Sequence, residues 1–224
     1  MSKIELISVY GNDATVCDAA RVSFDKKASN YSEEQNSRLI NYLVKHKHTS
    51  VFRHPQLTFR INCPIYVERQ LRKHEIGLEL GLPPEPNSSI NSISGRYVDF
   101  SDTYTLIKEW RTQSKDSKQG SADPLDFYGQ SACDEIEYAV KEFCQNAYKK
   151  LIDLGVSKEQ ARTILPLNLN TTFLWTGSLL SFIHVFNLRL KADAQQETRE
   201  VVAEMLRLLK ENGNFAESLK AFEL

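Results

Sequence analysis

The sequence lacks several features that would assign it to a common class at once. Its net charge is −1 over 224 residues, so no basic surplus indicates a nucleic acid or an anionic membrane as a partner. It has no apolar stretch long enough to span a bilayer and no signal-peptide pattern at its N-terminus. We therefore expect a cytoplasmic protein without nucleic-acid or membrane partners.

Cysteine pairs and a glycine-rich nucleotide loop are also missing. The four cysteines show no C-x-x-C spacing, which favours buried free thiols over a disulfide or zinc framework; they are Cys17, Cys63, Cys133 and Cys144. No G-x-G-x-x-G motif follows the first predicted strand, so a Rossmann fold has no support. Hydrophobic residues make up 41% of the chain, enough for a core in one large domain or two small ones.

Hydrophobic periodicity predicts a mixture of strands and helices. Alternating residues predict strands over 3–9, 56–62 and 168–176. Apolar residues three and four apart predict helices over 14–22, 32–47, 65–75, 126–154, 178–190, 194–211 and 214–222. Helix 178–190 is nearly all apolar, so we expect it to be buried. Predicted helix caps are Asn12 or Asp13 for the first helix, Ser32 for the second, and Ser157 in a capping box with Gln160. Predicted loops are 77–89, which holds three prolines, and 114–124.

Residues 69–97 combine a charged helix end with a small polar turn. Five ionisable side chains fall within seven residues: Arg69, Arg72, Lys73, His74 and Glu75. Gln70 lies three and four residues before Lys73 and His74, so these three share one helix face. The turn over 92–96 can present backbone amides beside Arg96, which together suit a phosphate. The alternative is a solvated helix end followed by a surface loop.

Three of the five histidines fall within residues 46–54. Metal binding is the first interpretation of such a cluster. The carboxylates and cysteines that usually complete a metal site are not nearby. We therefore predict no metal here.

Two separated blocks of the sequence resemble the flavin-dependent thymidylate synthases. In the first, Lys73-His74-Glu75 and Ser94-Gly95-Arg96-Tyr97 stand where the family has a basic, histidine-containing helix end and a Ser-rich turn. The second block, residues 157–189, contains Ala161-Arg162 and Leu165-Pro166 and ends in Asn187-Leu188-Arg189. Two shorter stretches also match: Ala19–Ser23, and the segment with His46, His48, Phe52 and His54, which lines the flavin and folate pocket in the family.

The resemblance implies a fold and an activity. The fold is α+β, with an antiparallel sheet flanked by helices, in one domain spanning 1–224. Four copies form a homotetramer whose active sites are shared between subunits. The activity is reductive methylation of dUMP to dTMP, with FAD as the cofactor and with methylenetetrahydrofolate and NADPH as co-substrates.

The resemblance also implies roles for individual residues. Arg189 would be catalytic, because an arginine beside the C2 carbonyl and N3 of uracil would stabilise negative charge in the ring. The substrate would be bound by Gln70, Arg72, Lys73, Ser92, Ser94, Gly95, Arg96, Arg162 and Arg189. The flavin would contact Ser50, Lys73, His74, Glu75, Ser178 and His184, and His48 would border the folate entrance. No cysteine is needed as a nucleophile.

The chain departs from the family pattern at several positions. Arg53 and Ser92 each replace a usual Glu, Glu75 replaces a cation or a neutral polar residue, and Leu180 replaces a common basic residue. The proline-rich segment 77–89 resembles an insertion within the first block. These departures leave two alternatives open. One is a related flavin and folate enzyme that methylates or hydroxymethylates another pyrimidine nucleotide. The other is a catalytically weak nucleotide- or flavin-binding relative.

Overall fold

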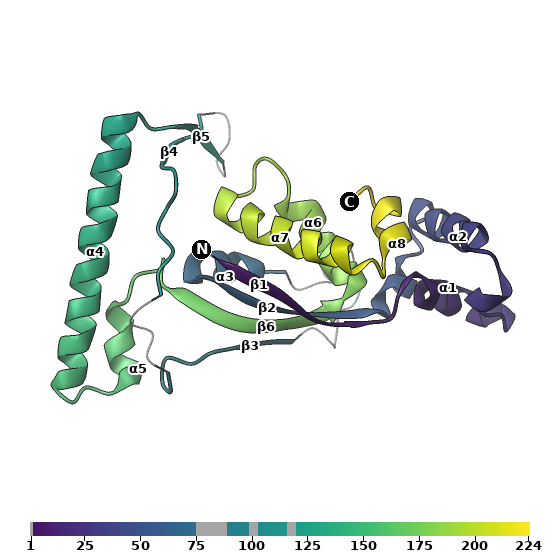
Figure 1. Cartoon of the computed structure of the whole chain (residues 1–224), viewed down its shortest axis with the longest axis horizontal. Coiled ribbons are helices and arrows are strands. Elements are labelled where there is room, and N and C mark those ends of the chain that lie inside the picture. Colours follow the sequence, from purple (N-terminus) through teal and green to yellow (C-terminus); the bar gives the residue numbers. More distant parts are fainter. Residues whose placement is uncertain (1, 75–88, 99–102, 116–119) are drawn as a thin grey trace.

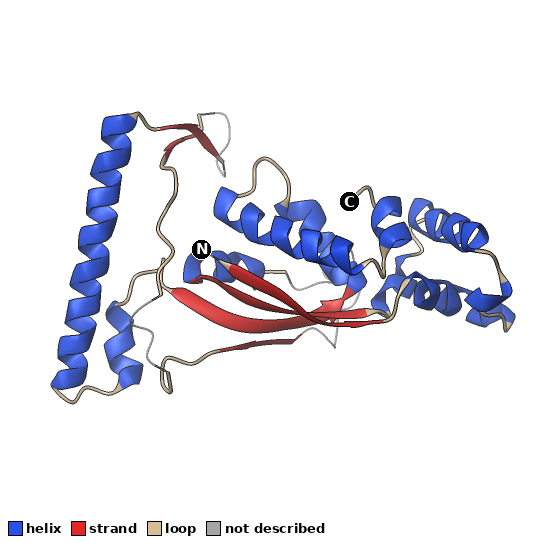
Figure 2. Ribbon diagram, viewed as in Figure 1, coloured by secondary structure: helices blue, strands red, loops and turns tan. Residues whose placement is uncertain are grey.

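The structure is a computed structural model that describes residues 2–74, 89–98, 103–115 and 120–224. Its centre is a four-stranded antiparallel sheet in the order β1-β2-β6-β3, which Figures 1 and 2 show edge-on beneath the helices. The strands are β1 (Lys3–Tyr10), β2 (Gln56–Pro64), β6 (Asn170–Ser178) and β3 (Ser89–Ser92). The predicted α+β class with an antiparallel sheet is therefore confirmed.

The two central strands give the sheet one apolar and one polar face. Phe59 on β2 lies opposite Trp175 on β6, and both are fully buried. On the other face, paired polar side chains meet across the same strands: Thr58 with Thr176 at 3.0 Å, and Asn62 with Thr172 at 2.9 Å. This follows from the two-residue period of a strand, which sends successive side chains to opposite faces.

Two helices cover the apolar face of the sheet. They are α6 (Leu179–Arg189) and α7 (Gln196–Asn212), which lie above the sheet in Figure 1. The ring of Phe182 on α6 packs 5.0 Å from the rings of both Phe59 and Trp175, measured between centroids. The predicted burial of this helix is confirmed, because seven of its eleven residues are buried. The polar residue Arg189 ends the helix, where the chain leaves the core.

The two ends of the sheet carry different helices. At one end lie α1 (Asp13–Arg21), α2 (Glu33–Lys45) and α8 (Ala216–Ala221). Of the two predicted caps of α1, Asn12 caps the helix and Asp13 is its first residue. Ser32 caps α2 as predicted, and both caps form a capping box with the residue three positions on. At the other end lie α3 (Ile65–Leu71), α5 (Lys158–Ala161), the long α4 (Phe127–Asp153) and a hairpin of β4 (Arg111–Gln113) with β5 (Ser121–Pro124).

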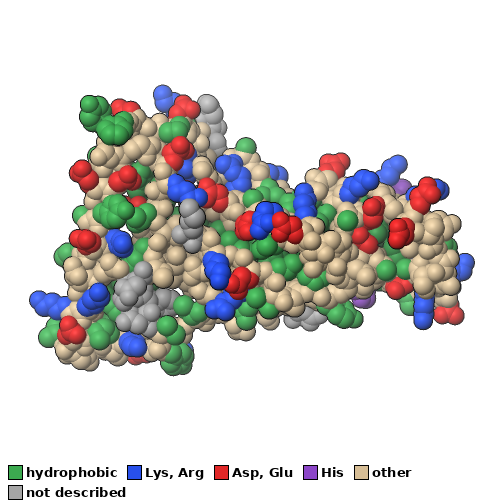
Figure 3. All heavy atoms as spheres, viewed as in Figure 1, with side chains coloured by type: hydrophobic (Ala, Val, Ile, Leu, Met, Phe, Trp, Pro, Cys, Tyr) green, Lys and Arg blue, Asp and Glu red, His purple; other side chains and the backbone are tan. Residues whose placement is uncertain are grey.

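Helix α4 keeps the apolar stripe that the sequence predicts but leaves most of it uncovered. Tyr148 is its only buried residue. Large apolar side chains that stay exposed on α4 are Phe127, Tyr128, Ile136, Tyr138, Val140 and Phe143. Hydrophobic side chains are visible along this edge of the molecule in Figure 3. An exposed apolar face of this length is typical of an interface.

The structure corrects several local predictions. Helix α3 ends at Leu71 and not at 75, because the amides of Lys73 and His74 bond three residues back, to Gln70 and Leu71, and tighten the last turn. The capping box at Ser157 does not form, since its side chain makes no cap hydrogen bond. The predicted loop over 114–124 contains β5, and β3 was not predicted. Glu75 and residues 77–88 lie outside the described residues.

None of the helices in the described residues combines the length and apolar character that a bilayer span needs.

Candidate functional site

The ends of α3 and α6 and the link to α7 enclose an open hollow of about 470 Å³. Three predicted site residues on α3 and the turn after it line this hollow: Gln70, Lys73 and His74. Arg189 lines it from the last residue of α6. The first and second blocks of the sequence therefore meet here through residues such as His74 and Arg189, which are 115 positions apart. The remaining lining residues are Leu188, Lys191, Asp193, Ala194 and Gln195.

Arg189 is held in place by a histidine. Its Nε donates to Nε2 of His74 at 2.7 Å, and its guanidinium also reaches the backbone carbonyl of Gln70 at 3.5 Å. An accepting nitrogen carries no proton, so the His74 ring is in its neutral form with the proton on Nδ1. His74 is 5% exposed, and the ring of His184 lies edge-on to it at 6.1 Å. The guanidinium is thus oriented by packed neighbours at the edge of the core.

Gln70 is fixed by hydrogen bonds at both ends of its side-chain amide. Its nitrogen donates to the Gln195 carbonyl, and its oxygen accepts from the hydroxyl of Thr198 at 3.1 Å. Thr198 is fully buried on α7. The amide therefore has one defined orientation at the wall of the hollow.

Arg72 joins α3 to β3 and does not line the hollow. Its guanidinium binds the largely buried carboxylate of Glu68, one helical turn earlier, and the hydroxyl of Ser92 at the end of β3. This arginine is committed to protein partners, which weakens its predicted role in substrate binding. It does place Ser92 near the end of α3, so two segments of the first sequence block lie close together.

The turn after β3 forms where predicted but uses several of its own amides. The Ser94 carbonyl accepts from the amides of Tyr97 and Val98 at 3.0 and 3.1 Å, and the Ser94 hydroxyl accepts from the amide of Arg96 at 3.3 Å. Fewer amides are thus left for a phosphate than the sequence predicts. Gly95 is buried, whereas Arg96 is exposed, with its guanidinium 5.4 Å from the centre of the Tyr97 ring. Arg96 does not line the hollow.

Other predicted site residues lie elsewhere on the chain. His48 and Ser50 are exposed near the start of α6, and Ser178 is buried as the cap of that helix, accepting from the Ser181 amide at 3.1 Å. The eleven residues of α6 separate Ser178 from the far end of the helix at Arg189, a length of about 16 Å. Arg162 is exposed on the short helix Arg162–Ile164, beside α4. Within one chain, these side chains and the hollow do not meet.

Several residues of the site were missed by sequence reasoning. Lys191, Asp193 and Gln195 line the hollow from the link between α6 and α7. Their signal was available, because polar residues directly follow the predicted catalytic Arg189. No comparable signal pointed to the ion pair of Arg111 with Glu197, whose partners are 86 residues apart.

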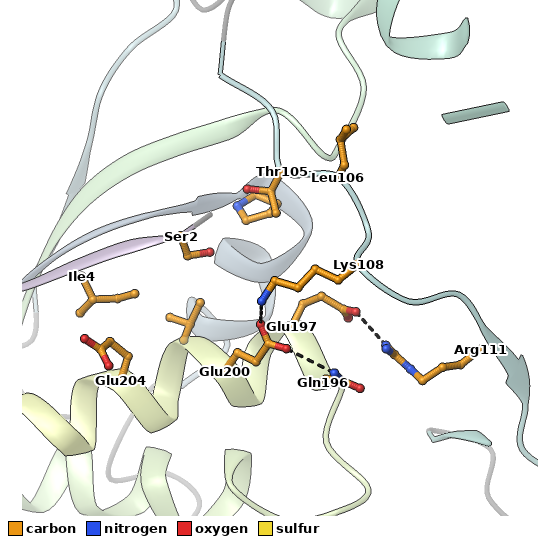
Figure 4. A pocket seen from close by; sticks show the side chains of 12 residues that line it. Ser2, Ile4, Thr105, Leu106, Lys108, Arg111, Gln196, Glu197, Glu200 and Glu204 are labelled. Carbon is orange, nitrogen blue, oxygen red and sulfur yellow. Dashed lines mark hydrogen bonds and ion pairs between the residues drawn. The ribbon is translucent and has the colours of Figure 1, made fainter. Parts of the chain in front are cut away.

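That ion pair lines a second hollow of about 230 Å³, shown in Figure 4. Gln195 lines the first hollow, and the next two residues, Gln196 and Glu197, line the second. Burial alone would raise the pKa of Glu197. Hydrogen bonds from Arg111 and Gln195, with its own backbone amide, hold that pKa below its ordinary value. Burial and the nearby carboxylates of Glu197 and Glu137 raise the pKa of Tyr66.

The described residues form neither a metal centre nor a reactive thiol site. No group of three His, Cys, Asp or Glu side chains gathers there as a metal centre would require. The thiols of Cys17 and Cys63 are buried, and burial raises the pKa of Cys63 to about 12. Such a thiol is almost fully protonated near neutral pH and is a poor nucleophile.

The sequence matches the model of a protein family described as thymidylate synthase complementing protein, over residues 5–212. Flavin-dependent thymidylate synthase of Kosmotoga olearia is 36% identical over 211 residues, which cover 92% of this chain and 84% of the relative. The enzyme of the same name from Thermus thermophilus is 33% identical over 212 residues, covering 93% of this chain and 71% of the relative.

Solved structures agree on the fold. A UMP/dUMP methylase from Streptomyces cacaoi, crystallised with 5-Br UMP, superposes with a TM-score of 0.82 at 22% identity. The match covers 100% of this chain and 94% of the methylase chain. Because the sequence identity is only 22%, this match supports the fold and not the function. The family match and the curated relatives, each spanning most of the sequence, show that this chain belongs to the flavin-dependent thymidylate synthases, a family of methyltransferase enzymes.

Proposed function

We propose that this protein catalyses the reductive methylation of dUMP to dTMP, with FAD bound, methylenetetrahydrofolate as the carbon donor and NADPH as the reductant. The observation that carries the proposal is the meeting of the two sequence blocks in one hollow, where His74 orients Arg189 beside Gln70 and Lys73. Family membership and the names of the relatives support the same reaction.

The donors around the hollow fit a flavin nucleotide. Lys73 and Arg189 bring two cations to its wall, and His184 lies next to His74 behind it. Cationic donors suit the phosphates and ring carbonyls of such a ligand. FAD supplies the redox chemistry when it is bound, so the chain has to bind, orient and exclude water.

Arg189 is the residue that we assign to the chemical step. Its guanidinium is half-buried at the end of an apolar helix, where water competes less for its donors than at the surface. Placed beside the C2 carbonyl and N3 of the uracil, it would stabilise the negative charge that develops as the ring becomes a nucleophile at C5. Gln70 would hold the base or the sugar, and Arg96, Arg162 and the turn at Ser94-Gly95 would bind the phosphate.

The separation of these groups within one chain supports a shared site in a homotetramer. Arg96 and Arg162 do not line the hollow, although both are assigned to the substrate. Arg162 lies beside α4, whose exposed apolar residues suit a second copy of the chain. Docking of copies through α4 would carry Arg162 of one subunit toward the hollow of another.

Titration of the purified protein with FAD tests the cofactor. We expect bound flavin to absorb near about 450 nm and its spectrum to shift on binding. A protein that neither shifts nor quenches added FAD would contradict the flavin assignment and favour the nucleotide-binding relative.

Anaerobic assays then test the reaction. The NADPH-reduced, FAD-loaded enzyme is mixed with methylenetetrahydrofolate and either dUMP or UMP, and the nucleotide product is identified by mass. We expect dTMP from dUMP. A methylated or hydroxymethylated product from UMP alone would establish the alternative pyrimidine.

A further inference from the structure

A continuous run of side-chain hydrogen bonds links the second hollow to the first. The guanidinium of Arg111 donates to one oxygen of Glu197 at 2.7 Å, and the other oxygen accepts from the Gln195 amide at 2.9 Å. The Gln195 carbonyl accepts from the Gln70 amide. The Gln70 carbonyl in turn accepts from the Thr198 hydroxyl at 3.1 Å. The run thus starts on the β4 strand and ends on a residue assigned to the substrate.

The donors and acceptors along this run allow only one orientation of each of the two side-chain amides, those of Gln195 and Gln70. Arginine offers donors alone, and an ionised carboxylate offers acceptors alone. Glu197 therefore requires the NH2 group of Gln195 to face it, which turns the Gln195 carbonyl toward Gln70. That carbonyl in turn requires the NH2 group of Gln70. Reversing either amide would set two oxygen atoms against each other.

The ionised state of Glu197 fixes both orientations, and its surroundings maintain that state. The side chains of Arg111 and Glu197 are only 13% and 16% exposed, so water competes little for the ion pair. Burial alone would raise the pKa of Glu197, but hydrogen bonds from Arg111, from its own backbone amide and from Gln195 hold it low. Arg111 is anchored as well, since its Nε donates to Ser121 on β5 at 2.8 Å.

We propose that the Arg111–Glu197 pair positions the substrate-binding amide of the first hollow. Acting through Gln195, the pair makes Gln70 present an N–H donor, and not a carbonyl, to an acceptor oxygen of the pyrimidine nucleotide. The Gln70 amide has two hydrogens, of which one is bonded to Gln195 and the second can be donated to the ligand. This inference rests on the proposed function, where Gln70 contacts the nucleotide.

A second ion pair, which lines the second hollow together with Arg111 and Glu197, offers a matched control. Lys108 binds Glu200 at 2.8 Å, three residues after Glu197 on α7 (Figure 4). These side chains are 58% and 44% exposed, and Glu200 accepts from Gln196, which does not line the first hollow. The Lys108–Glu200 pair therefore resembles the Arg111–Glu197 pair in chemistry and place but is not connected to Gln70.

The test is a double-mutant cycle between Glu197→Gln and Gln70→Ala. Calorimetry gives the Kd of dUMP for the FAD-loaded protein, and turnover at saturating dUMP gives kcat. Glutamine at 197 can donate or accept, so both orientations of the neighbouring amides become available. We expect Glu197→Gln to raise the Kd about three- to tenfold, the size of one misdirected hydrogen bond, with kcat nearly unchanged. In the Gln70→Ala background it should raise the Kd no further, and Glu200→Gln should leave the Kd unchanged.

Each other outcome has a defined meaning. The inference is overturned if Glu197→Gln raises the Kd equally in both backgrounds, because a merely structural role acts without Gln70. It is also overturned if Gln70→Ala weakens binding while Glu197→Gln does not. A wild-type Kd in Gln70→Ala removes the assigned role of Gln70 and the inference with it. A wild-type protein that binds dUMP but forms no dTMP sinks the proposed reaction and leaves the Kd comparison able to decide the inference.

Discussion

Helices α6 and α4 are both rich in apolar residues, yet the fold treats them in opposite ways. Seven of the eleven residues of α6 are buried between the sheet and its neighbours. In α4, Tyr148 is the only buried residue, and Phe143 on its apolar stripe is 74% exposed. The apolar residues of α6 are thus covered by other parts of the same chain, whereas most of those of α4 are not.

The difference separates two kinds of residue that we propose for the site. Arg189 ends α6, so its position is set inside one chain by core packing and by His74. Arg162 lies beside the uncovered α4, and it is not among the described residues that line the hollow. We therefore expect groups near α6 to act in every folded subunit and groups near α4 to act only after assembly.

Replacing Arg189 should give the largest effect. We expect Arg189→Ala to lower the single-turnover rate of flavin oxidation by substrate about 10²–10³-fold, because the lost donor acts mainly in the transition state. Anaerobic stopped-flow on reduced enzyme with dUMP and methylenetetrahydrofolate measures this rate, and absorbance confirms that FAD stays bound. Arg207→Ala, on the exposed face of α7, is the control. A wild-type rate for Arg189→Ala at saturating dUMP would disprove its role in activating the uracil.

Placing a charge on α4 should have the next largest effect. Phe143→Glu puts a carboxylate in the apolar stripe, and an aromatic anchor at an interface is typically worth about 2 kcal/mol, or a factor of about 30 in the dissociation constant. If the wild-type protein forms the proposed tetramer through α4, we expect sedimentation velocity to show smaller species for Phe143→Glu than for the wild type at equal concentration. Lys149→Glu, also exposed on α4 and outside the stripe, is the control. An unchanged mass for Phe143→Glu would remove α4 from the interface.

Local patterns in the sequence predicted most of the fold. The strands β1, β2 and β6 and the helices α1, α2, α4, α6, α7 and α8 all fall where periodicity places them. The missed strands β3, β4 and β5 are three or four residues long. Strand β3 depends on a partner far along the chain, as Ile90 pairs with Trp175, whereas β4 and β5 depend on pairing with each other. Such pairing leaves no periodic signal in a short segment.

The site was predictable where one helix end sets it and not where tertiary contacts do. Gln70, Lys73 and His74 meet at the end of α3 and the tight turn after it, and the resemblance supplied Arg189. The Arg111–Glu197 pair could not be foreseen, because either charge alone has the pattern of a solvated surface residue. Ser178, which the resemblance assigns to the flavin, is also the buried cap of α6, a use that was not predicted from the sequence.

Removing the Arg96 side chain should affect binding more than chemistry. The phosphate that we assign to Arg96 does not change during the reaction, so its contacts are equally strong in the ground and transition states. We expect Arg96→Ala to raise the KM for dUMP about tenfold or more, as loss of a charged hydrogen bond does, with kcat nearly unchanged. Steady-state kinetics over a range of dUMP concentrations separates the two constants. A lower kcat with an unchanged KM would move Arg96 from phosphate binding to the chemical step.

Replacing the cysteines should have the smallest effect on turnover. Two of them lie in the core and two lie on α4, so they also allow these two regions to be compared. Cys17 and Cys63 are buried, and burial raises the pKa of both thiols. Cys133 and Cys144 lie on α4 and are partly exposed. We expect replacement of all four by serine or alanine to leave kcat and KM nearly unchanged, because none lines the first hollow. Loss of turnover in a folded single variant would indicate a nucleophilic cysteine.

Thiol labelling extends this prediction to assembly. In the folded wild-type protein, a disulfide reagent should modify Cys133 and Cys144 before Cys17 and Cys63, since reaction requires an accessible thiolate. If copies dock through α4, its two thiols should be partly protected in the tetramer and should react faster in the Phe143→Glu variant. The labelling of Cys17 and Cys63 should not change, because Phe143→Glu leaves the core intact. Equal labelling rates on α4 before and after dissociation would mean that the subunits meet elsewhere, and Arg162 would then need another route to the hollow.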